Sequence, residues 1–159
     1  MHDQADELPI VGVIGAGSFG TAISNLLALN ARVLLYSRNA ELVQQINQTH
    51  RHFDLDLSER IRATANLQEV AETCTLLFPI VPSANFREMM QELSPFLRPY
   101  HLLIHGTKGF DVKRKAGEPE DGPITSDNVC TMSEVIRQES VVVRIGCLSG
   151  PNLAREIMA

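Results

Sequence analysis

The sequence lacks the features that would place the protein in a membrane, in the secretory pathway or on a nucleic acid. No apolar run reaches about 18 residues, the length that a transmembrane helix needs. Residues 1–7 have neither the basic start nor the apolar centre of a signal peptide. Lys and Arg number 14 against 19 Asp and Glu, which gives a net charge of -5. Because nucleic-acid binders usually carry a basic patch, we expect neither a nucleic acid nor a membrane as partner.

Cysteine is also scarce. The three cysteines, Cys74, Cys130 and Cys147, are far apart and odd in number. They form no Cys-x-x-Cys metal pattern and no disulfide framework. We therefore expect a reducing, cytoplasmic location, with these cysteines acting as small apolar side chains rather than as nucleophiles.

The composition that remains is that of an ordinary globular chain. The 159 residues are 44% hydrophobic and 21% charged, and a chain of this length can bury a real core. Residues 1–8 are predicted to form a flexible tail, and residues 9–159 one domain. Within that domain, short apolar runs rich in β-branched residues alternate with segments of helical periodicity.

The alternation predicts a doubly wound α/β fold with a mostly parallel sheet. Strands are expected over residues 8–14, 32–36, 75–81, 101–105 and 141–145. Helices are expected over residues 18–30, 39–49 with Asn39 as N-cap, 66–74, from 83 onward, 132–138 and from 150 onward. Residues 50–62 are too polar to assign, Pro79 is awkward inside a strand, and residues 113–127 are interpreted as a surface insertion. Ligands of such sheets bind outside the carboxyl ends of the strands.

A glycine-rich turn follows the first predicted strand. Residues 15–20 fit the pattern G-x-G-x-x-G through Gly15, Gly17 and Gly20. In a Rossmann-type dinucleotide-binding domain these glycines form a tight turn, let the backbone approach a pyrophosphate, and let the helix pack on the strand. Free N–H groups at the helix N-terminus then face the anion. The alternative is a glycine turn without a ligand. A phosphate-binding P-loop is excluded, because Thr21 and Ala22 stand where Lys and Ser or Thr are required.

The end of the second strand bears on the choice of cofactor. An acidic residue there would bind the ribose 2′-hydroxyl of NAD, whereas an arginine accommodates the 2′-phosphate of NADP. The sequence has Ser37 and Arg38, with no acidic residue before Glu41. We therefore expect NADP to be accepted and preferred, the alternative being a solvated arginine beside bound NAD.

Two later strand ends carry further candidates. Lys108 lies between glycines after the strand at 101–105, where its ammonium could meet a substrate phosphate or a carbonyl oxygen; a solvated turn lysine is the alternative. Asn152 is expected to cap a helix whose N-terminus points at the crevice, and capping chemistry alone also explains it. No metal site is expected, because the histidines and aspartates at residues 50–56 lack a second ligand cluster.

Together these motifs resemble the N-terminal half of the NAD(P)-dependent glycerol-3-phosphate dehydrogenases, from Val11 to Glu156. The parts that carry the resemblance are residues 15–22, Val81-Pro82-Ser83, residues 106–109 and residues 149–154. The family interconverts sn-glycerol 3-phosphate and dihydroxyacetone phosphate with NAD or NADP, in glycerophospholipid precursor synthesis. Two stretches depart from the family pattern: residues 52–57 lack its usual prolines, and residues 113–127 are longer than in the shorter bacterial members.

The resemblance also implies roles for individual residues. Cofactor contacts fall on Gly15, Gly17, Ser18, Phe19, Gly20, Ser37, Arg38, Pro82, Lys108 and Ala154. Substrate contacts fall on Lys108, Gly150 and Asn152.

The family's lysine general acid lies in a second, helical domain that is absent from this chain. We therefore expect cofactor binding without appreciable turnover from these 159 residues. The resemblance is also compatible with a homodimer of the full-length enzyme. Two alternatives stay open: a related two-domain reductase of the ketopantoate or β-hydroxyacid dehydrogenase type, and a nucleotide-sensing module without enzyme activity.

Overall fold

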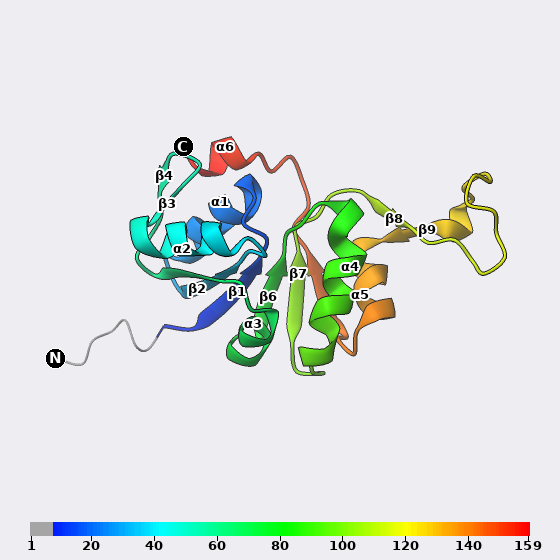
Figure 1. The fold of residues 1–159 in the computed structure, drawn as a ribbon, viewed down its shortest axis with the longest axis horizontal. Coiled ribbons are helices and arrows are strands. Elements are labelled where there is room, and N and C mark those ends of the chain that lie inside the picture. Colours follow the sequence, from blue (N-terminus) through cyan, green and yellow to red (C-terminus); the bar gives the residue numbers. More distant parts are fainter. Residues whose placement is uncertain (1–7) are drawn as a thin grey trace.

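The computed structural model describes residues 8–159, and its centre is a six-stranded parallel sheet (Figure 1). Of the predicted tail, only Leu8 lies within the described residues. In chain order the strands of the sheet are β1 (Ile10–Ile14), β2 (Arg32–Tyr36), β5 (Ile61–Thr64), β6 (Leu76–Pro79), β7 (Leu102–His105) and β10 (Arg144–Cys147).

Their order across the sheet is β10-β7-β6-β1-β2-β5, and every pairing between them is parallel. Numbered by their own succession, the strands therefore run 6-5-4-1-2-3, the order of the Rossmann dinucleotide-binding fold. This confirms the predicted fold class. The chain reverses its direction of travel across the sheet between β1 and β6, and such a switch point opens a crevice at the carboxyl ends of the two strands.

Helices cover both faces of the sheet because its strands are apolar on both sides. On one face α1 (Ser18–Leu27) and α2 (Ala40–Thr49) pack over a core that includes Val13, Val33 and Ile46. The short α6 (Ala154–Ile157) lies against α1. No helix within residues 8–159 is long and apolar enough to cross a membrane.

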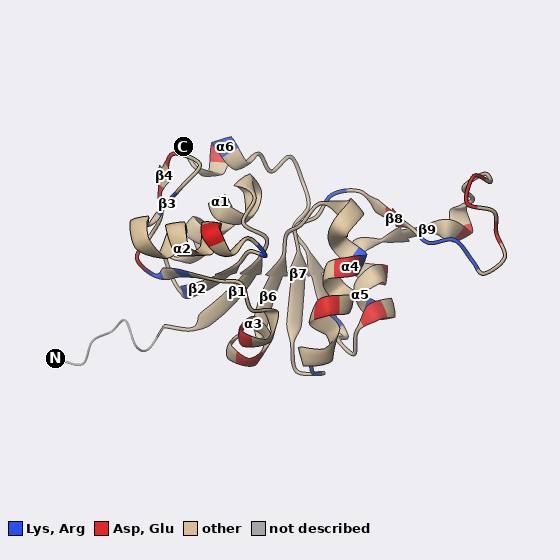
Figure 2. Cartoon of the chain, in the orientation of Figure 1, with Lys and Arg blue, Asp and Glu red and all other residues tan. Residues whose placement is uncertain are grey.

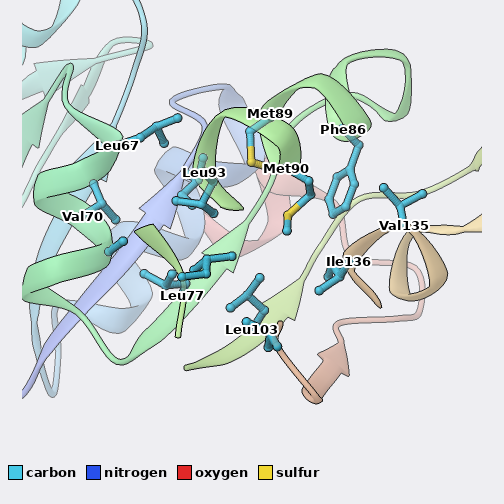
Figure 3. Close-up of a cluster of buried hydrophobic side chains, with 14 of the residues drawn as sticks. Leu67, Val70, Leu77, Phe86, Met89, Met90, Leu93, Leu103, Val135 and Ile136 are labelled. Carbon is cyan, nitrogen blue, oxygen red and sulfur yellow. The ribbon is translucent and has the colours of Figure 1, made fainter. Parts of the chain in front are cut away.

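The opposite face is covered by α3 (Leu67–Thr73), α4 (Ser83–Leu93) and α5 (Met132–Glu139). Figure 3 shows how Phe86, Met89 and Met90 of α4 lie over strand residues such as Leu77 and Leu103. Phe86 and Met90 are fully buried. Since a buried side chain of this size stabilises a fold by about 1.5–3 kcal/mol, α4 is firmly fixed to the sheet. Because α4 also forms one wall of the crevice, the position of that wall is fixed as well.

Two small antiparallel ribbons lie outside the main sheet. The first pairs β3 (Arg51–His52) with β4 (Leu55–Asp56). The second pairs β8 (Phe110–Val112) with β9 (Val129–Thr131), and the loop between them ends in a 3-10 turn at Ser126–Asn128. This ribbon and its loop project from the body of the molecule, as predicted for a surface insertion (Figure 1).

An ionic clamp fixes the base of the β8–β9 ribbon. Arg87 of α4 donates to Asp111 of β8 at 2.8 Å and also pairs with Glu139 of α5. All three side chains are only 15–16% exposed. Burial by itself lowers the pKa of Arg87, but its two carboxylate partners more than offset this, so the pKa is raised and the guanidinium stays charged.

Three element predictions need correction. The last strand is β10 (Arg144–Cys147), not residues 141–145, because residues 140–143 are needed to lead the chain from α5 into the sheet. Val141 and Val143 are accordingly exposed while Val142 is buried. The edge strand β5 was missed. The strand at residues 75–81 ends at Pro79, and its paired register with β7 stops at Leu77, before the proline that has no N–H to donate.

Candidate functional site

The glycine turn between β1 and α1 is folded tightly against the next crevice loop. Gly15 has φ +119°, and a Cβ there would lie 2.0 Å from the carbonyl oxygen of Ile80. A Cβ on Gly20 would lie 1.9 Å from the carbonyl oxygen of Gly15. Both positions therefore require glycine. Gly17 differs, because a Cβ there would meet no atom within 4 Å and would project into open space. The backbone is thus bare where an anion would approach.

Two helix N-termini at this crevice have no side-chain cap. Gly17 begins α1 and Pro82 begins α4 without a side-chain hydrogen bond, and neither helix has an acidic residue in its first turn. By contrast, α2 is capped by Asn39, α3 by Asn66 and α5 by Thr131. The first-turn amides of a helix need partners, and the helix dipole makes its N-terminus electropositive. The two uncapped ends therefore leave donors available to an anionic ligand.

A pocket of about 250 Å³ opens between the end of β2 and helix α4. One wall is formed by the glycine turn together with Tyr36, Ser37 and Arg38. The Ser37 side chain accepts from Asn39 N at 3.2 Å, which ties this loop to the start of α2. The opposite wall is formed by residues of the β6–α4 loop and α4: Ile80, Val81, Pro82, Asn85, Glu88, Met89 and Glu92.

A second pocket of about 320 Å³ lies on the other side of the turn, over the ends of β6 and β7. Its lining includes Phe19, Thr107 and Lys108. The hydroxyl of Thr107 donates to the carbonyl of Val81 at 2.7 Å and so joins the two loops that frame the pocket. Gly106 gives the Phe19 ring room, since a Cβ at position 106 would lie 2.8 Å from that ring.

The structure brings most of the predicted site residues to these two adjoining pockets. The lining residues among them are Gly15, Gly17, Ser18, Phe19, Gly20, Ser37, Arg38, Pro82, Lys108 and Asn152. Gly150 and Ala154 line neither pocket. The prediction that Asn152 caps a helix is wrong: α6 begins at Ala154 after Leu153, and the Asn152 amide instead donates to the carbonyl of Ser149 at 3.3 Å.

The sequence analysis missed two further features of the site. Tyr36 and the α4 residues 85, 88, 89 and 92 line the first pocket. The spacing of the α4 residues marks one face of a helix, so it is a signal that could have been read. The second feature is His52 of the β3–β4 ribbon. Its Nε2 atom lies 2.9 Å from the carbonyl oxygen of Ala16 in the glycine turn.

Among residues 8–159 no group of three or more His, Cys, Asp or Glu could hold a metal ion.

His105 ends β7 immediately before the second pocket. The residue is 5% exposed, its ring meets Phe86 edge-on, and its Nε2 atom is hydrogen-bonded to the hydroxyl of Ser133 at 3.0 Å. Burial lowers its pKa, so the imidazole is neutral at pH 7. It therefore adds no charge to the site, where Lys108 and Arg38 are the lining cations of the two pockets.

The strand order, the glycine turn and the two uncapped helix ends together define a Rossmann-type dinucleotide-binding domain. The comparison with protein families is specific: residues 10–159 match the model described as "NAD-dependent glycerol-3-phosphate dehydrogenase N-terminus". The chain belongs to that family, as its motifs predicted, and the ketopantoate-reductase alternative is not favoured.

Known relatives agree with this assignment. The chain is 34% identical over 154 residues to the glycerol-3-phosphate dehydrogenase [NAD(P)+] of Acinetobacter baumannii, covering 94% of this chain and 39% of that protein. It is 38% identical over 155 residues to the enzyme of the same name from an Exiguobacterium species, covering 92% and 41%. The chain thus spans about two fifths of the length of the curated relatives that it matches.

Solved structures are similar over the same span. The crystal structure of glycerol-3-phosphate dehydrogenase from Coxiella burnetii matches with a TM-score of 0.77 and 25% identity, covering 95% of this chain and 43% of that one. A ketopantoate reductase from Ralstonia eutropha matches with a TM-score of 0.63 at 17% identity, which shows a shared fold alone.

Proposed function

We propose that this domain binds NAD or NADP across the switch point of its sheet and serves the interconversion of sn-glycerol 3-phosphate and dihydroxyacetone phosphate. The observation that carries the proposal is the glycine turn. Its backbone is closed on one side by Gly15 and Gly20 and open on the other at Gly17, beside an uncapped α1. A diphosphate fits this cradle, because it supplies the acceptors that the first-turn amides lack.

The two pockets suit the two ends of such a cofactor. The amides from Gly17 to Gly20 would hold the diphosphate between them. Ser37 and Arg38 would hold the adenosine end, with the guanidinium available to a 2′-phosphate. Phe19 and Pro82 would bound the second pocket, which then receives the nicotinamide. Of the remaining predicted cofactor contacts, Ala154 stays a prediction of the family resemblance.

Substrate chemistry is proposed for the second pocket. When bound, the nicotinamide supplies or accepts the hydride. Lys108 is exposed and lines this pocket, so its ammonium would attract a substrate phosphate or the carbonyl oxygen that gains charge. Asn152 would add a polar contact from the opposite loop. Gly150, at φ +118°, would shape that loop rather than line the pocket.

Titration tests the binding step. The purified 159-residue chain is expected to bind NADH and NADPH in isothermal titration, and Gly17→Ala should weaken both binding events. Dihydroxyacetone phosphate with NADPH is expected to give no appreciable turnover from this chain, because by resemblance the general acid belongs to a second domain. Absence of any cofactor binding would refute the proposal, and oxidation of NADPH at an ordinary enzyme rate would refute the expectation about turnover.

A further inference from the structure

The pocket beside β2 has walls of opposite charge. Arg38 stands on the wall formed by the end of β2, and Glu88 and Glu92 stand on the α4 wall. The two glutamates are four residues apart, so they lie one helical turn from each other on the same face. Figure 2 shows the acidic positions along α4. The lining of this pocket therefore carries one cation and two anions, in the part of the site where the adenosine ribose would lie.

Charges on both walls of the pocket affect the pKa of the Tyr36 phenol. Burial raises the pKa of Tyr36 most, Glu92 raises it further, and Arg38 lowers it. The field of Glu92 thus extends across the pocket to the end of β2, where Arg38 acts in the opposite sense. Because both side chains are exposed, water and salt screen these fields in part.

The 2′-phosphate of NADP would interact with the charges of both Arg38 and Glu92. The uncharged 2′-hydroxyl of NAD would interact only weakly with either charge. A phosphate monoester carries a charge of about -1.5 to -2 at pH 7, so Arg38 attracts it and a carboxylate repels it. We propose that Glu92 sets the cofactor selectivity of this site, by weakening the binding of NADP against the attraction of Arg38. The inference rests on the proposed function, since it concerns the same cofactor pocket.

Substitution of Glu92 by Gln isolates this effect, because it removes the charge and keeps the shape. The dissociation constant for NADPH is expected to fall about two- to fivefold, the scale of an exposed charge pair, while that for NADH stays unchanged. The gain should shrink as salt is added. Glu72→Gln is the matched control: Glu72 is an exposed carboxylate of α3, bonded to Gln68 and absent from the pocket lining, so both affinities should stay as in the wild type.

Each other outcome decides the question. An equal change for NADH and NADPH in Glu92→Gln would mean that Glu92 contacts a part that both cofactors share, and would overturn the proposal. The same would follow from no change at all, or from an equal NADPH gain in Glu72→Gln, which would show only an effect of net charge. If the wild type binds neither cofactor, the proposed function itself falls, and this inference falls with it.

Discussion

Substitution of Gly17 by Ala separates the fold of the glycine turn from its function. Residue 17 has φ -74° and ψ -179°, which alanine adopts freely, and the new methyl would meet no atom within 4 Å. Alanine is a poorer N-cap than glycine, by up to about 1 kcal/mol. It also stiffens the unfolded chain, which stabilises by about 0.4–1 kcal/mol. The two effects offset, so Tm should shift by no more than about 2–4 °C.

Cofactor binding should respond very differently. The methyl would occupy space beside the bare amides, where the diphosphate is proposed to lie. Overpacking of this kind costs about 1–3 kcal/mol, which corresponds to a roughly 5- to 150-fold rise in Kd for NADH. Thermal unfolding followed by circular dichroism and titration with NADH measure the two quantities separately.

Gly20→Ala provides the contrast. Its Cβ would lie 1.9 Å from a backbone oxygen, so we expect destabilisation by about 3 kcal/mol or more. The reasoning would be refuted if Gly17→Ala stayed folded and bound NADH within twofold of the wild type. A Gly20→Ala protein as stable as the wild type would refute the structural half.

The remaining predictions concern charge and titration. Arg87→Met leaves two mostly buried carboxylates beside each other, so urea unfolding should show a loss of about 1–3 kcal/mol, and unchanged stability would contradict the clamp. Because the pKa of His105 is lowered in the folded state, the unfolded chain takes up its proton first as the pH falls through about 6.5. The free energy of unfolding should therefore fall between pH 7 and 5, and His105→Asn should make that fall shallower; an identical pH profile would count against it. Burial, aided by a nearby glutamate, raises the pKa of Cys74 to about 11, whereas Cys147 is exposed. Iodoacetamide at pH 8 should thus label Cys147 well before Cys74 in the native protein, as peptide mass spectrometry would show, and equal labelling would refute the burial.

The sequence was sufficient wherever one local pattern decides the structure. The β2 strand was predicted with its observed bounds, because a short apolar run between polar residues favours a buried strand. The cap of α2 by Asn39 was equally predictable, and the structure confirms it, with the side chain accepting from Leu42 N at 3.1 Å. The glycine turn was found because its spacing, its preceding strand and its following helix agree.

Prediction failed where the outcome depends on distant parts of the chain. The edge strand β5 has only four residues, and Arg62 interrupts its apolar pattern, so its place beside β2 follows from the completed sheet. The role of α4 as a pocket wall needs the switch point to bring it opposite β2. The prediction that Asn152 caps a helix failed for a local reason. The Asn152 side chain donates to the carbonyl of Ser149, and such local hydrogen bonds compete with helix capping.

The β8–β9 ribbon has a practical consequence for work with this protein. Its base is held by the Arg87 clamp, and its loop runs outside the sheet, on the far side of the body from the β2 end of the crevice (Figure 1). Foreign peptides inserted at exposed loop tips are tolerated when no buried backbone is disturbed. We therefore expect an epitope or fluorophore grafted between Glu120 and Asp121, which are both exposed, to leave the crevice and its ligand binding unchanged.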